Sequence, residues 1–336
     1  MPVLGAAAGG GGGVTPTISF LGSQTWAPSY DMEAYVYVIG GGGSGCAGSN
    51  TGDFLSGGGA GGCAISKLSL SSGTTYTITI GAGGTQVSNS SGYTVGNAGG
   101  NTSLSGSGIS TMTGNGGSGG LRIAYSPGTG DGASGGTATG GTIANFTGGK
   151  GGGSTSQHNS GRSGGGAVGL WATGNNGADG LGITAQNTFL QGGNPTFDLG
   201  TYAANKHLNQ ASAVGGGTSD IAIPTISPFG MNVSAVEYQG TIDGSNYRQG
   251  LPHLRLTGSP DIYQGYYNTS THFSGTIAPP FHGGIGMVSN FPHYGGNASL
   301  GGGGGAGGIR SGNTGTAYGG SGGTGAVLIF PLSIGS

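Results

Sequence analysis

The chain has 336 residues, of which 88 are glycine and 13 are proline, while only 5% are charged and the formal net charge is −2. Eight Lys and Arg residues form no basic patch, which argues against nucleic-acid binding, and no apolar run has the length of a membrane span. Glycine does not recur at every third residue, which excludes collagen, and the low charge argues against disorder.

The glycine content raises the question of what holds the backbone in place. Glycine loses more conformational freedom on folding than any other residue, and it buries no apolar side chain. An ordered chain of this composition therefore needs a dense network of backbone hydrogen bonds, an oligomer interface, or both. We infer a mainly β protein with irregular loops and almost no helix. Its short strands and hairpins would carry glycine-rich segments packed as a polyglycine-II-like bundle of threefold helices.

The beginning of the sequence predicts a docking arm followed by strands. Residues 1–17 are rich in Gly and Ala, and they lack the basic region and long apolar core of a signal peptide, so we do not expect Sec export by this sequence. Residues 18–26 are apolar and typical of a strand. Met32–Ile39 alternates between two faces and runs directly into Gly40–Gly43, where every side chain is lost at once.

Two further strands follow the first glycine excursion. Cys63–Leu70 alternates between small or polar and apolar residues, and Thr74–Ile80 alternates throughout. Only Ser71–Gly73 separates these strands, which predicts a β-hairpin.

Cys46 and Cys63 flank the first glycine excursion. They are either two small buried thiols or a loop-closing disulfide, because the sequence does not say whether their Cα atoms approach closely enough to be bridged. Two cysteines without a paired CxxC motif do not predict a zinc site.

The order of elements between residues 20 and 120 is specific. Trp26 and a turn at Pro28 precede the alternating strand Tyr35–Ile39 and its four glycines, and the strings SSGTTYTITIGAGG and GNAGGNTSL follow. This order resembles the glycine-rich domain of bacteriophage tail proteins and tail-fibre adhesins. The resemblance implies polyglycine-II bundles at a fibre tip, loops that touch the host surface, a homotrimer, and contacts with other tail proteins in the virion.

The remaining sequence alternates between glycine-rich and aromatic-rich parts. Glycine stays frequent up to residue 180, and single large residues such as Leu121 and Leu170 are expected to anchor the glycine segments against the strands. Residues 181–300 contain less glycine and more aromatics, His and Pro, which indicates irregular β structure, with one short helix expected at Thr201–Gln210.

Glycine returns at the end of the chain. The last apolar run, Ala326–Leu332, is typical of a buried strand that can pair with Tyr35–Ile39. The expected domains are therefore a docking arm (1–17), a glycine-rich β/polyglycine domain (18–180), an aromatic-rich region (181–300), and a glycine-rich return with a closing strand (301–336).

The aromatic-rich region contains the best candidate binding residues. Tyr combined with Asn, Ser and Gly is the composition of adaptable binding surfaces, although the aromatics could equally form the core of this region. We expect the stretch YQGYYNTSTHF, residues 263–273, to be exposed. The candidate receptor-binding residues are Tyr263, Tyr266, Tyr267, Asn268, His272 and Phe273.

Nothing in the sequence marks a catalytic or metal site. The ten carboxylates are scattered, and no two are marked as the pair that a glycoside hydrolase needs. Four of the six histidines fall late in the chain, without the short spacing of a metal motif, and no nucleophile elbow, HExxH or P-loop occurs. We therefore expect no enzyme activity, no cofactor and no metal.

The expected function is host recognition. The sequence predicts a non-catalytic tail-fibre or tail-tip protein of the virion that binds a bacterial surface glycan or an outer-membrane protein, without membrane insertion. The alternative is a purely structural virion decoration or a self-assembling extracellular fibre subunit. The weakest hypothesis is a glycan-depolymerising enzyme, which would need two carboxylates facing each other in a groove.

Overall fold

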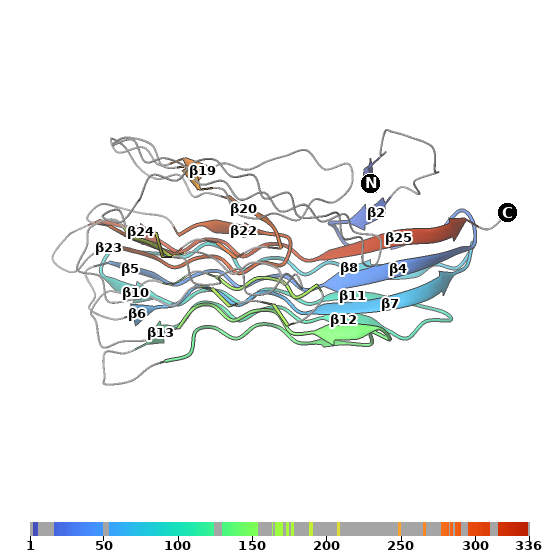
Figure 1. Cartoon of the computed structure of the whole chain (residues 1–336), viewed down its shortest axis with the longest axis horizontal. Coiled ribbons are helices and arrows are strands. Elements are labelled where there is room, and N and C mark those ends of the chain that lie inside the picture. Colours follow the sequence, from blue (N-terminus) through green and yellow to red (C-terminus); the bar gives the residue numbers. More distant parts are fainter. Residues whose placement is uncertain are drawn as a thin grey trace.

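The structure is a computed structural model of an elongated molecule with strands at one end and long, irregular, glycine-rich segments behind them (Figure 1). The residues it describes are 3–5, 17–49, 54–123, 130–153, 163, 165–170, 173–174, 176–177, 188–190, 207–208, 248–249, 265–266, 277–281, 283–284, 286–289, 295–309 and 315–334. Within these ranges the regular structure is entirely β, as the sequence predicts.

The largest sheet, called sheet A here, is antiparallel throughout and has the order β1-β2-β25-β4-β7-β15. The predicted pairing of the last strand with an early one is confirmed, because β25 lies beside β4 with Ala326 opposite Ile39 and Phe330 opposite Tyr35. The strands of sheet A are β1 (Val3–Gly5), β2 (Thr17–Phe20), β4 (Met32–Ile39), β7 (Cys63–Leu70), β15 (Ala144–Phe146) and β25 (Ala326–Ile334).

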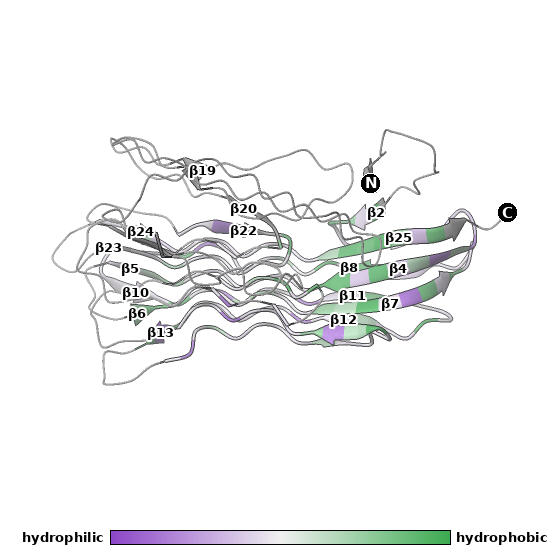
Figure 2. Cartoon of the chain, viewed as in Figure 1, coloured by the Kyte–Doolittle hydropathy of each residue, from purple (hydrophilic) through white to green (hydrophobic). Residues whose placement is uncertain are grey.

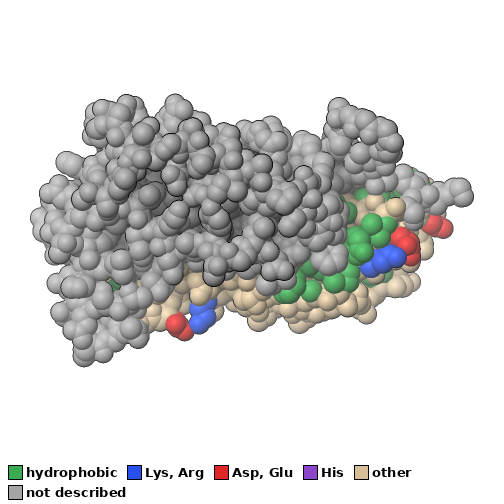
Figure 3. Space-filling model, viewed as in Figure 1, with side chains coloured by type: hydrophobic (Ala, Val, Ile, Leu, Met, Phe, Trp, Pro, Cys, Tyr) green, Lys and Arg blue, Asp and Glu red, His purple; other side chains and the backbone are tan. Residues whose placement is uncertain are grey.

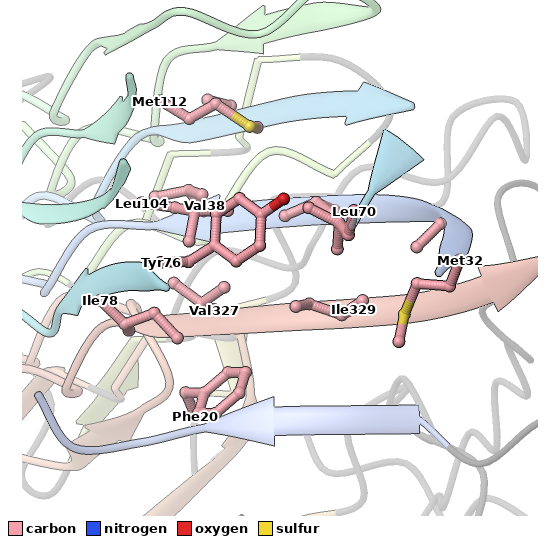
Figure 4. Close-up of a cluster of buried hydrophobic side chains, with 13 residues drawn as sticks. Phe20, Met32, Val38, Leu70, Tyr76, Ile78, Leu104, Met112, Val327 and Ile329 are labelled. Atoms are coloured by element: carbon pink, nitrogen blue, oxygen red, sulfur yellow. The ribbon is translucent and has the colours of Figure 1, made fainter. Parts of the chain in front are cut away.

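A second sheet, sheet B, packs on one face of sheet A. Its strands are β3 (Gln24–Trp26), β8 (Tyr76–Thr79), β11 (Thr102–Gly106), β12 (Met112–Gly114) and β14 (Ala138–Thr139), in the order β14-β12-β11-β8-β3. Figure 4 shows the apolar core between the sheets, and Figure 2 shows that hydrophobic residues concentrate on the strands at this end. The buried side chains of this core include Phe20, Val36, Val38, Tyr76, Ile78, Leu104, Met112, Val327 and Ile329.

The predicted hairpin across Ser71–Gly73 is wrong. β7 pairs with β4 and β15 in sheet A, whereas β8 pairs with β11 and β3 in sheet B. The short turn instead carries the chain from one sheet to the other, so that Leu70 and Tyr76 enter the shared core from opposite sides. Asp31 holds this turn, because its Oδ1 accepts a hydrogen bond of 2.7 Å from the Ser72 N–H, which lowers the pKa of Asp31.

The glycine segments continue from the ends of the strands and form a hydrogen-bonded bundle. In Gly40–Cys46 the N–H groups of Gly40, Gly43 and Cys46 donate to one segment, residues 56–62. Those of Gly41 and Ser44 donate to residues 97–100, and those of Gly42 and Gly45 donate to residues 320–323. Successive N–H groups of this segment therefore donate hydrogen bonds to three different neighbours in turn, and every third N–H returns to the same neighbour. This is expected of a backbone with three residues per turn.

The same segment also accepts hydrogen bonds from three other segments. The carbonyls of Gly41 and Ser44 accept from Gly117 and Gly120, and that of Gly42 accepts from Gly84. Those of Gly43 and Cys46 accept from Gly304 and Gly307. Gly40–Cys46 thus lies at the centre of six hydrogen-bonded neighbours. The polyglycine-II conformation itself stays a prediction.

The bundle leaves no room for side chains at its interior glycines. A Cβ atom on Gly42 would overlap with the carbonyl oxygen of Gly302, and one on Gly43 would overlap with that of Ser118. A Cβ on Gly58 would overlap with the carbonyl oxygen of Gly43. Glycine is required here because the backbones approach so closely.

Serine side chains supply acceptors within the bundle. The Ser44 Oγ accepts from the Asn97 N–H at 2.8 Å, while the Ser44 N–H donates to the Asn97 carbonyl at 2.9 Å. The Ser56 Oγ likewise accepts from the Leu121 N–H at 2.7 Å. These short polar side chains satisfy N–H groups that would otherwise be left without a partner.

Short strands lie at the other end of the bundle, in sheet C, with the order β10-β5-β23-β21-β16-β17, and in the pairs β13-β6 and β24-β9. Two further pairs are β18-β19 and β20-β22. Their bounds are β5 (Ala47–Ser49), β6 (Phe54–Leu55), β9 (Ser88–Asn89), β10 (Gly92–Thr94), β13 (Arg122–Ile123), β16 (Thr188–Leu190), β17 (His207–Leu208), β18 (Arg248–Gln249), β19 (Gly265–Tyr266), β20 (Ile277–Pro280), β21 (Gly286–Ser289), β22 (Asn297–Ser299), β23 (Gly307–Ile309) and β24 (Ala317–Tyr318). Within the expected helix Thr201–Gln210, His207 and Leu208 form β17, and the other residues lie outside the described ranges.

Replacing Gly42 with Ala should destabilise the protein strongly, because the added methyl forces two backbones apart. We expect a loss of at least 1–3 kcal/mol, roughly the cost of an overpacked core, measured as a lower midpoint of urea unfolding. Gly22→Ala is the matched control. Gly22 is exposed and its Cβ would meet nothing within 4 Å, so this change should leave the midpoint the same or slightly higher. Equal midpoints for the two variants would contradict the packing described here.

Replacing Ser44 with Ala should cost about 1–3 kcal/mol, because the Asn97 N–H then loses its acceptor. The same unfolding measurement tests it. Ser134 is exposed, so Ser134→Ala removes a hydroxyl from the bundle surface and should change the midpoint little. If both serine variants unfold alike, the side-chain acceptor at Ser44 contributes nothing to stability.

Candidate functional site

The two ends of the molecule are built from different strands. β2 and the last residues of β25 lie at the sandwich end, whereas β5, β6, β10, β13, β23 and β24 lie at the opposite end, which we call the distal tip (Figure 1). Among the described residues, Gly40–Cys46 runs out from β4 and residues 56–62 return beside it to β7, and residues 81–84 and 96–100 run out and back in the same way. The short strands between such segments, among them β5, β6 and β10, lie at the distal tip.

Tyr93 and Arg122 form the clearest side-chain contact at the distal tip. Tyr93 lies on β10, opposite Gly48 of β5, and Arg122 lies on β13, opposite Leu55 of β6. The Arg122 guanidinium carbon is 4.6 Å from the centroid of the Tyr93 ring, and Nη1 donates to the Tyr93 hydroxyl at 3.3 Å. This stacking orients a tyrosine that is still 41% exposed.

Two apolar side chains extend this surface. Val95 is 48% exposed and Leu121 is 43% exposed, and the bond from the Gly96 N–H to the Gly120 carbonyl brings their two chain segments together. We call Tyr93, Val95, Leu121 and Arg122 the tip patch. It contains three of the six exposed large apolar side chains found among the described residues, while the other three, Leu21, Ile143 and Leu332, lie at the sandwich end.

The sequence did not indicate the tip patch. Leu121 was expected to anchor a glycine segment, but its side chain is exposed, whereas Leu170 is buried in the core as expected. The signal that could have located Tyr93 is its position midway between the glycine segments at 81–84 and 96–100.

The predicted receptor-binding stretch is described only in part. Gly265–Tyr266 forms β19 and pairs with Arg248–Gln249. Of the other candidates, Tyr263, Tyr267, Asn268, His272 and Phe273 lie outside the described residues.

The two cysteines are free, buried thiols rather than the possible disulfide. The reason is the register of the excursion: Cys46 donates to Ser56, whereas Cys63 lies opposite Ile39. The two cysteines are thus separated by the length of a glycine segment, about 20 Å at roughly 3 Å per residue, far beyond the reach of a disulfide.

The buried Cys63 thiol and the buried Tyr37 hydroxyl are both unsuited to nucleophilic chemistry. Burial raises the pKa of the Cys63 thiol far above its ordinary value, and it does the same to the pKa of the Tyr37 hydroxyl. The described residues contain no cluster of three or more His, Cys, Asp or Glu side chains that could hold a metal ion. They also contain no helix long and apolar enough to cross a membrane.

Charged side chains are sparse on the described surface, and four of them form two ion pairs. Lys150 contacts Asp131 at 2.7 Å and lowers the pKa of its carboxyl, and Lys67 contacts Glu33 at 2.9 Å. Figure 3 shows that the described part of this face consists of backbone and uncharged side chains, with a hydrophobic area toward the sandwich end and charged atoms in only a few places. The described surface therefore offers aromatic, apolar and hydrogen-bonding groups more than net charge.

The fold and the surface define a glycine-rich β scaffold with short strands at its distal tip. Residues 16–250 match the family model of the glycine-rich domain, and the chain belongs to this family. The fold includes residues beyond the matched range, because β25 (Ala326–Ile334) lies in the middle of sheet A, between β2 and β4. A search of curated proteins found no match to the sequence.

Both cysteines should be unreactive in the native protein, because each is 0% exposed and the pKa of Cys63 is raised. We expect a thiol reagent such as DTNB to titrate no thiol under native conditions and both thiols in denaturant without reductant. A disulfide would instead give no reactive thiol under either condition.

Proposed function

We propose that this protein is a bacteriophage tail-fibre or tail-tip adhesin that recognises a bacterial surface glycan or an outer-membrane protein without catalysis. Its site of action would be the tail of the virion, where it would contact other tail proteins and further copies of itself, with a homotrimer expected from the resemblance to tail fibres. Membership of the glycine-rich domain family and the order of elements between residues 20 and 120 support this proposal.

The observation that carries the proposal is the separation of the two ends. The strands nearest the chain termini lie at the sandwich end, and the tip patch lies at the distal tip (Figure 1). A protein attached to a particle through its sandwich end would present its distal loops outward. Exposed Tyr, Val and Leu side chains next to an Arg suit the apolar faces and hydroxyl groups of a sugar.

Weak single sites are sufficient for such a protein. A small patch buries little area and binds weakly alone, but several copies on one particle bind with avidity that exceeds the single affinity by orders of magnitude. Glycine segments with very few charges would hold the patches at a fixed distance from the point of attachment.

The test is binding of purified protein to a panel of bacterial strains, their extracted polysaccharides and their outer membranes. We expect the double variant Tyr93→Ala, Arg122→Ala to bind at least about tenfold more weakly than wild type, or 1.4 kcal/mol, as for residues at a binding hot spot. Leu21→Ala is the matched control, since Leu21 is 54% exposed next to β2 at the sandwich end.

A second double variant, Tyr266→Ala with Tyr267→Ala, tests the stretch predicted from the sequence. If only this variant loses binding, the receptor site belongs to residues 263–273 and the tip patch is not the contact. If wild type binds no strain but assembles into particles or filaments, the adhesin proposal fails and the purely structural alternative replaces it.

A further inference from the structure

β1 completes sheet A by covering one edge of β2. Val3, Leu4 and Gly5 lie opposite Ser19, Ile18 and Thr17, while the other edge of β2 pairs with β25. Without β1, the outer N–H and C=O groups of β2 would be an open sheet edge, which pairs readily with another chain. A strand of only three residues therefore decides whether this edge is closed.

The connection between β1 and β2 is much longer than a hairpin needs. Antiparallel neighbours are usually joined by two to five residues, whereas residues 6–16 separate these strands. Eleven residues can span up to about 36–40 Å when extended, and neighbouring strands lie only about 5 Å apart. The chain connection therefore permits β1 to reach a β2 edge on an adjacent molecule.

The pairing is also short enough to exchange. Three residue pairs contribute only a few backbone hydrogen bonds, each worth about 0.5–1.5 kcal/mol net, so the opening of β1 costs little compared with unfolding of the sheet. The same bonds form whether β1 comes from its own chain or from a second copy. The outcome then depends on how close the copies lie.

We propose that β1 is an exchangeable strand, and that in an assembly of copies the β1 of one protomer pairs with the β2 of its neighbour. The partner is a second copy of this chain, because only another copy offers both the same strand and the same edge. Strand exchange of this kind links protomers without requiring a new interface. It would join the copies at the sandwich end and leave their distal tips free.

The proposal is independent of receptor binding, and engineered cysteines test it. One variant carries Leu4→Cys and a second carries Ile18→Cys, two positions that face each other in the pairing. Mixed, incubated and oxidised, the two variants should form a covalent dimer of about 64 kDa, twice the 32.0 kDa chain, on a non-reducing gel. The native Cys46 and Cys63 are buried and present in every sample.

The control mixture replaces Ile18→Cys with Leu21→Cys, an exposed position that has no partner in β1 and should give little covalent dimer. Concentrations from about 1 µM to about 1 mM bracket the effective concentration of a short tether. A single chain with both Leu4→Cys and Ile18→Cys reports the pairing within one molecule. If that chain closes on itself while the mixture forms no more dimer than the control, exchange does not occur. If neither sample forms a bond, β1 does not pair with β2, and the proposal is equally wrong.

Discussion

The structure depends on backbone hydrogen bonds between glycine segments that lie too close together, at their glycine positions, for a side chain. Each such bond contributes about 0.5–1.5 kcal/mol net, while ordering a residue costs about 1–2 kcal/mol. The bundle therefore offsets much of its own ordering cost but supplies little surplus stability. That surplus comes from the apolar core between sheets A and B, where Phe20, Tyr76 and other large side chains are fully buried.

The sandwich also fixes which segments meet in the bundle. β4 pairs with β7 up to Ile39 and Cys63, and the next residues, Gly40 and Gly62, continue the contact as the first bond of the bundle. β25 begins one residue after Gly325, whose N–H donates to Gly81. Glycine segments are nearly identical to one another, so their own sequences specify register weakly. The strands with alternating side chains specify the register of the glycine segments that continue from them.

The sequence was sufficient for features that have a local pattern. Alternation located Met32–Ile39 and Cys63–Leu70, and the closing strand was paired correctly with the early one. The hairpin predicted at Ser71–Gly73 is wrong, because a hairpin and a link between two sheets have the same local sequence. They differ only in which strands lie next to each other, and no pattern within residues 63–80 records that.

The candidate site was harder to predict because position along the bundle, and not residue type, decides exposure. Leu170 and Leu121 are both leucines in similar glycine-rich sequence, yet Leu170 is buried and Leu121 is exposed at the distal tip. The site is found by following each excursion to its turning point, which requires the partners of every segment. Those partners are far apart in sequence, as in the contact between Gly42 and Gly323.

The difference between the packed bundle and the exposed tip determines which residues of the protein can be substituted. Within the bundle almost any substitution at glycine forces backbones apart, as at Gly42 and Gly58. At the turning points the side chains of Tyr93 and Leu121 contribute surface rather than packing, so they can be exchanged at little cost in stability. A scaffold with an unchangeable interior and a permissive end can vary its surface while the fold stays the same, which is what the proposed adhesin would require to follow variable surface receptors.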